Sequence, residues 1–137
     1  MVSSEVIGSR LKKLTEYIRL LEKLKLHPKK AFLEDPFIYG NVERYLQLSI
    51  QVVIDISNHI LSERNINGLK EYRDMIIGLG KEGLIPEELA AKIAPMAGLR
   101  NLLVHEYIEI DHEKLFDIIQ HHLEDFKDFA KHISKLL

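Results

Sequence analysis

Apolar residues in the first part of the chain recur at helical spacing. Between Ser3 or Ser4, either of which can serve as the N-cap, and Pro28, they stand alternately four and three positions apart. These residues are Ile7, Leu11, Leu14, Ile18 and Leu21. The pattern predicts a long amphipathic helix that ends before Pro28.

A longer helix is predicted from about Pro36, which follows the capping residue Asp35, to about Arg64. Its apolar residues spread too far around the helix to form one narrow stripe, and so we expect burial on more than one side. They include Val42, Leu46, Ile50, Val53, Ile54, Ile56, Ile60 and Leu61.

Three further helical stretches complete the chain. A short helix is predicted over residues 69–79, before two glycines, and another helical stretch over 86–107. The second contains Pro95, which removes a backbone donor and crowds the preceding turn, and so we expect a kink or split near Ala94. A last helix follows Asp111, with apolar residues again four and three apart.

These elements predict an all-α, up-and-down bundle of four main helices plus a short helix. The 137 residues, 46% hydrophobic and 29% charged, fit a single globular domain over 1–137. Without cysteine the chain has no disulfide, thiolate–zinc site or cysteine nucleophile. It also lacks an apolar run of the roughly 20 residues that span a bilayer, and a signal-peptide core at its start, so we expect a cytoplasmic protein.

Charge is distributed unevenly along the chain. The formal net charge of -2 argues against nucleic-acid binding through overall positive charge. Residues 1–30, however, hold eight Lys or Arg against three Glu, whereas residues 105–128 hold eight acids against two Lys. We interpret these segments as two solvated helix faces that attract each other or a neighbouring subunit, with phosphate binding by the basic segment as the alternative.

Polar side chains interrupt the apolar pattern most clearly around Arg100. The stripe that passes through Leu89, Ile93 and Met96 next reaches Arg100, and a guanidinium there needs an acidic partner or an anionic ligand. Asn101 and His105, four residues apart, share a helix face. Arg100 and His105 would lie about 140° apart on an ideal helix, so a joint site requires a bend, the helix edge or a second subunit.

An arginine and a histidine together suit phosphodiester cleavage without a metal. The imidazole can move protons near neutral pH, while the guanidinium holds the phosphate and stabilises its developing charge. The 2′-hydroxyl of RNA supplies an internal nucleophile. Spacing alone nevertheless favours a structural interpretation, in which the arginine pairs with a carboxylate and the histidine faces solvent.

Two other groups of titratable residues occur in the sequence. Asp55, between two isoleucines, fits a buried carboxylate that accepts a hydrogen bond or pairs with Arg100 across an interface, and positioning is favoured over proton transfer. His59 lies four residues later on the same face. The mixture of His112, His121 and His122 with nearby acids lacks a specific metal-ligand motif, and we interpret it as a solvated helix face.

The segment Met96 to Tyr107 resembles the R-x4-H-x-Y motif of HepT-like proteins in the HEPN superfamily, with Arg100, His105 and Tyr107 at its fixed positions. The resemblance covers nearly the whole chain. It includes the basic first helix and the segments 32–36, 55–59, 72–74, 83–89 and 110–112.

The resemblance implies a homodimer in which two motif-bearing helices line a cleft, acting as a metal-independent endoribonuclease toxin without a cofactor. Arg100 and His105 would then be the catalytic pair, and Asn101 and Asp55 would support them. The implied partner is a minimal nucleotidyltransferase antitoxin that attaches AMP to Tyr107, where the added phosphate would repel RNA. Because the chain is acidic overall and Pro95 precedes the motif, the alternative is a non-catalytic homodimer that binds nucleotide or the nucleotidyltransferase.

Overall fold

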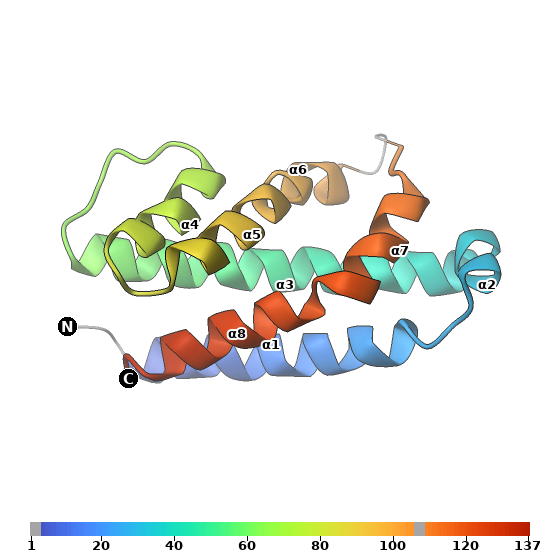
Figure 1. Ribbon diagram of the computed structural model, residues 1–137, viewed down its shortest axis with the longest axis horizontal. Coiled ribbons are helices and arrows are strands. Elements are labelled where there is room, and N and C mark those ends of the chain that lie inside the picture. The colour runs from blue at the N-terminus through green and yellow to red at the C-terminus, as the bar shows by residue number, and fades with distance from the viewer. Residues whose placement is uncertain (1–3, 106–108) are drawn as a thin grey trace.

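The computed structural model describes residues 4–105 and 109–137, which form eight helical segments. In chain order these are α1 (Ser4–Leu24), α2 (Lys29–Glu34), α3 (Pro36–Glu63), α4 (Tyr72–Lys81), α5 (Glu87–Ala97), α6 (Leu99–Val104), α7 (His112–His121) and α8 (Leu123–Ser134). Four passes alternate in direction: α1, α3, the pair α5 and α6, and the pair α7 and α8 (Figure 1). The predicted all-α, up-and-down architecture is confirmed.

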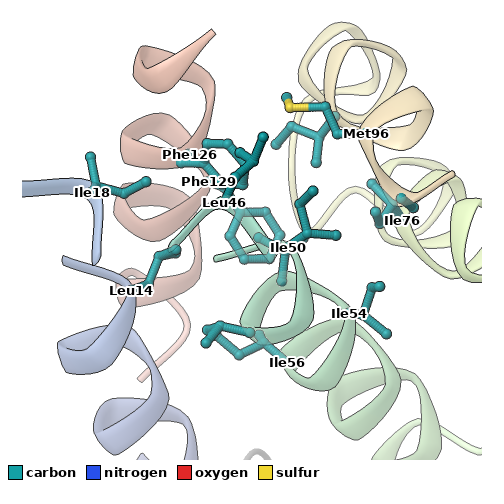
Figure 2. Packing of buried hydrophobic residues seen from close by; sticks show 14 of the residues in the cluster. Leu14, Ile18, Leu46, Ile50, Ile54, Ile56, Ile76, Met96, Phe126 and Phe129 are labelled. Carbon is teal, nitrogen blue, oxygen red and sulfur yellow. The ribbon is translucent and has the colours of Figure 1, made fainter. Parts of the chain in front are cut away.

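The core forms around α3. Figure 2 shows this helix between α1 and α8 on one side and α4 and α5 on the other, which confirms that it is buried on more than one side. The surrounding helices contribute Leu14 and Ile18, Phe126 and Phe129, Ile76, and Met96. Burying each of these large apolar side chains contributes about 1.5–3 kcal/mol to the stability of the fold. The core thereby holds in place the helices that also carry polar residues outside it.

Two predicted helix starts are capped by aspartate. The Asp35 carboxylate accepts a hydrogen bond from the Phe37 N–H at 2.9 Å, at the start of α3. Asp111 does the same at α7, accepting from the N–H groups of Glu113 and Lys114. Both caps satisfy backbone donors that have no partner within the helix.

The observed helices depart from the prediction at three places along the chain. The short helix starts at Tyr72 rather than at residue 69, because Asn65 and Gly68 adopt positive φ angles and the chain reaches Glu71 still extended. The predicted last helix is two helices, α7 and α8, which meet at His122. Short helix α2 was not predicted, since its six residues are too few to show a period.

The break that we expected near Ala94 lies at Gly98. Pro95 forfeits only the bond that its own missing N–H would make, and α5 continues to Ala97. The Gly98 N–H then donates to the Pro95 carbonyl at 3.2 Å, three residues back, before the helix resumes as α6. The joint therefore lies three residues after the proline, directly before the segment that contains Arg100.

The oppositely charged ends of the sequence lie side by side, since α1 packs on α8 and α2 on α7. Lys29 Nζ lies 3.8 Å from Glu113 Oε1, and Lys127 Nζ lies 2.7 Å from Glu22 Oε1. The hydrogen bond to Glu22 raises the pKa of the Lys127 ammonium above its usual value. The Lys29–Glu113 pair has the predicted polarity, whereas the Lys127–Glu22 pair joins a lysine of the acidic segment to a glutamate of the basic one. Each of these partly exposed pairs contributes no more than about 1 kcal/mol. No helix among the described residues has the length and apolar character of a membrane span.

The crossing of α4 and α5 depends on the absence of a side chain at Gly80. A Cβ there would lie 2.9 Å from the Ala90 Cβ and 3.3 Å from the Glu87 Cα. Gly80→Ala should therefore lower the free energy of unfolding by about 1–3 kcal/mol, because this overlap outweighs the gain of about 0.5–1 kcal/mol from alanine in a helix. Urea denaturation measures the difference. Gly8→Ala in α1, where a Cβ meets nothing within 4 Å, is the matched control and should not lose stability; equal stability of the two variants would contradict this packing.

Candidate active site

Arg100 on α6 is fixed by side chains from three helices. Its Nε donates to Gln51 Oε1 of α3 at 2.9 Å, and its Nη1 donates to Asn101 Oδ1 at 3.1 Å. The guanidinium carbon lies 5.4 Å from the centre of the Tyr72 ring on α4, within the range of a cation–π contact. The side chain is half-buried, and these contacts restrict its rotamers while leaving part of the fork for an anion.

The contact with Gln51 extends into a chain of polar side chains across α6, α3 and α1. Gln51 Nε2 donates to Asp55 Oδ1 at 2.9 Å, one turn further along α3. Arg10 Nη1 of α1 donates to Asp55 Oδ2 at 3.1 Å. Because the Arg10 and Asp55 side chains are 44% and 35% exposed, their attraction is worth little as stability. The effect of this chain is geometric, since it fixes which way Gln51 presents its carbonyl to Arg100.

His105 lies where the helix has just ended. It is the exposed C-cap of α6, with φ −88° and ψ 106°, and its N–H donates to the Asn101 carbonyl at 3.2 Å. The φ of His105 is close to the helical value and only its ψ is extended, so the chain leaves the helical path after this residue, and the two side chains still leave α6 about 140° apart. Asn101 joins the two, through its side chain to Arg100 and its backbone to His105. Tyr107, the third fixed position of the motif, lies outside the described residues.

The structure places the supporting candidates differently from the sequence-based prediction. Asp55 accepts hydrogen bonds, as expected, but it is half-buried, and within the chain its partners are Arg10 and Gln51 rather than Arg100. The reason is the helical spacing, which puts Gln51 between the carboxylate and the arginine. His59 does not join this cluster, because its Nε2 lies 3.0 Å from Glu63 Oε1, one turn further along α3.

The histidines near the C-terminus pair separately with acids. His121 lies 3.5 Å from Asp117, and His122 Nδ1 lies 3.1 Å from Asp125 Oδ2. Asp125 is only 7% exposed, so the interpretation as a wholly solvated face is wrong there. Within 4–105 and 109–137, no three His, Asp or Glu residues are grouped closely enough to hold a metal ion.

Three residues in contact with Arg100 or Asp55 were not predicted as site residues: Gln51, Arg10 and Tyr72. Gln51 stands four residues before Asp55, and this spacing alone was a usable signal for a hydrogen-bonded pair on one helix face. Arg10 and Tyr72 come from helices far away in the sequence. Their contacts depend on how the bundle packs.

Two surface hollows are lined by residues that contact Arg100. One, of about 570 Å³, lies between α1 and α3, and its lining includes Arg10, Gln51 and Asp55. The other, of about 500 Å³, lies between the start of α4 and the junction of α5 and α6, and its lining includes Tyr72 and Asn101.

An all-helical bundle with Arg-Asn on its third pass, and a histidine where that helix ends, defines a HEPN-type protein. The chain belongs to the ribonuclease HepT-like family, whose sequence model matches residues 14–133. The family membership that the motif indicated is therefore confirmed, and the protein is an enzyme of a ribonuclease family.

Named relatives agree with this assignment. The chain is 36% identical over 133 residues to the tRNA nuclease HepT of Aphanizomenon flos-aquae, covering 97% of this chain and 86% of that protein. It is 35% identical over 98 residues to the mRNA nuclease HepT of Shewanella oneidensis, covering 72% and 74%. A solved structure of the tri-AMPylated Shewanella oneidensis HEPN toxin in complex with MNT antitoxin is similar in fold, with a TM-score of 0.87, 28% identity, and coverage of 97% and 99%.

Proposed function

We propose that this protein is the endoribonuclease toxin of a toxin–antitoxin pair and that it cleaves RNA with Arg100 and His105, without a metal ion. The observation that carries the proposal is the fixed guanidinium of Arg100, joined through Asn101 to His105 at the end of the same helix. The names of the family and of its nuclease relatives support RNA as the substrate.

Arg100 and His105 have different roles in the proposed reaction. The RNA 2′-hydroxyl attacks the adjacent phosphorus, and the bond from phosphorus to the 5′-oxygen breaks. His105 moves a proton from the attacking hydroxyl or to the leaving oxygen, as an imidazole near neutral pH can. Arg100 binds the phosphate oxygens through paired N–H groups and stabilises their charge in the transition state.

The proposed working unit is a homodimer in which the motif-bearing segments of two copies line one cleft. The motif helix α6 supports this arrangement, because its Leu102 and Val104 side chains are 38% and 37% exposed beside the polar site. Exposed apolar side chains near a functional site are found at surfaces that bind another protein. A cleft between copies would also bring an Arg100 and a His105 together from opposite sides.

The proposed partner is a minimal nucleotidyltransferase antitoxin that transfers AMP to Tyr107. The AMPylated toxin in complex with MNT antitoxin, similar in fold, supports both the partner and the modification. A nucleotide phosphate next to Arg100 and His105 would occupy the anion site and repel RNA. RNA and the AMP donor are both cytoplasmic molecules, so we propose the cytoplasm as the compartment.

The test is incubation of the purified protein with total cellular RNA in EDTA, with the intact mass recorded on the same preparation. We expect cleavage by protein of unmodified mass, because neither side chain needs a metal for these steps. Protein whose mass has risen by AMP units should be inactive. Intact RNA with protein of unmodified mass would contradict the nuclease proposal and favour a non-catalytic dimer that binds nucleotide or the antitoxin.

A further inference from the structure

The hollow between α4 and α6 adjoins the motif and has no assigned role. Its lining is Lys70, Glu71, Tyr72, Arg73, Ala97, Gly98 and Asn101. Two of these residues also contact Arg100: Asn101 accepts its hydrogen bond, and the Tyr72 ring lies 5.4 Å from its guanidinium carbon. The arginine that would bind the scissile phosphate therefore stands at the edge of this hollow.

The charge of the hollow favours an anion. Lys70 and Arg73 are exposed, and among the described residues neither takes part in an ion pair within 4.0 Å, unlike Arg10 or Lys127. Glu71 is the one acid in the lining. Two cations therefore line a space that contains one carboxylate, and a third, Arg100, contacts two of the other lining residues. Such a surface raises the local concentration of phosphate groups.

Part of the lining consists mainly of backbone. It consists of Ala97 and Gly98, where the chain passes from α5 to α6, and Gly98 is exposed and carries no side chain. The joint at Gly98 thus leaves room for a sugar and a phosphate to approach the main chain. Figure 1 shows this junction beside the α4 helix, to which the green loop of residues 65–71 leads.

We propose that this hollow holds the backbone phosphate next to the scissile phosphate of a single-stranded RNA substrate. Lys70 and Arg73 bind the phosphate oxygens, while Arg100 binds the neighbouring phosphate at the reacting centre. The subsite rests on the proposed function for its substrate. Because it recognises the sugar–phosphate backbone, it supplies affinity and register along the strand without reading a base.

The test measures binding of a fluorescent single-stranded 2′-O-methyl RNA oligonucleotide, which has no free 2′-hydroxyl and cannot be cleaved. Protein without AMP adducts is used, as wild type and as the double variant Lys70→Gln and Arg73→Gln. We expect the variant to bind about tenfold or more weakly, since it loses two charge-assisted contacts. The slope of log affinity against log salt should become shallower by about 1.4. Lys131→Gln on α8, combined with Lys135→Gln at the C-cap of that helix, causes the same loss of charge away from the site and should bind as wild type does.

The outcomes separate the subsite from the nuclease proposal. If wild type cleaves ordinary RNA but the 70/73 variant binds and cleaves it as well as wild type does, the subsite is wrong and the nuclease stands. Loss of binding in the variant, with no cleavage by wild type, supports the subsite and contradicts the nuclease. AMP that displaces the oligonucleotide from wild type at concentrations equal to that of the RNA would assign the hollow to a free nucleotide instead. A variant that loses only antitoxin binding would also overturn the proposal.

Discussion

Protein with His105→Ala should cleave RNA about 10²–10⁴-fold more slowly than wild type, because a positioned general acid or base contributes a factor of that size. Arg100→Ala should lose about 10²–10³-fold, the usual cost of removing one group that stabilises charge in the transition state. Initial rates on one RNA oligonucleotide in EDTA measure both. His105 is exposed, and it caps α6 through its backbone N–H, which alanine retains. The substitution should therefore leave the far-ultraviolet circular dichroism and the denaturation midpoint almost unchanged.

The control for this prediction is His121→Ala, which removes another exposed histidine, one whose partner is Asp117 on α7. It should retain wild-type activity. Cleavage by His105→Ala protein at the wild-type rate would remove the imidazole from the mechanism.

Mixing the two inactive variants tests whether one site uses residues of two copies. In a symmetric dimer whose sites each take Arg100 from one copy and His105 from the other, every mixed dimer has one intact site, and an equal mixture regains about a quarter of wild-type activity. Sites contained within single copies regain nothing. Refolding or overnight exchange of the mixed proteins, followed by the same rate assay, separates these outcomes.

The helices could be predicted from the sequence because each buries an apolar stripe, and burial follows spacing. Ile7, Leu14 and Ile18 are all buried at the α1 surface, as their period requires. The boundaries were less predictable. The break at Gly98 depends on how the turn after Pro95 closes, and the break at His122 leaves the apolar period of the two flanking helices unchanged.

The site could be predicted from the sequence at the point where a charged residue interrupts an apolar pattern. Arg100 lies in an apolar stripe, and a guanidinium in that position required a partner. The partner itself was not predictable from local pattern, since Gln51 is 49 residues away in sequence and reaches Arg100 only when α6 packs on α3. The side chain of Gln51 is also neutral, so its charge does not mark it as a partner of a guanidinium. Asp55, which carries a negative charge, was chosen instead.

Gln51→Ala should lower kcat/KM for RNA by about 10- to 100-fold, although Gln51 touches no substrate in the proposed mechanism. It is a positioning residue: its carbonyl holds Arg100 Nε at 2.9 Å, and the misplacement of a reacting group by about 1 Å can cost 10²-fold. The loss should fall mainly on kcat, because Arg100 stabilises charge that develops in the transition state. The pH profile should keep its shape, since His105 still moves the proton.

The variant Gln51→Glu distinguishes positioning from a general loss of structure. Its carboxylate still accepts from Arg100 Nε, but it no longer donates to Asp55 and stands one turn from that like charge. Activity should therefore lie between those of wild type and Gln51→Ala, even though the charge change makes the glutamate variant the less stable of the two. Gln47→Ala, one turn earlier on α3, is the matched control and should be fully active. If activity instead follows stability across these variants, Gln51 acts only through the packing of α3.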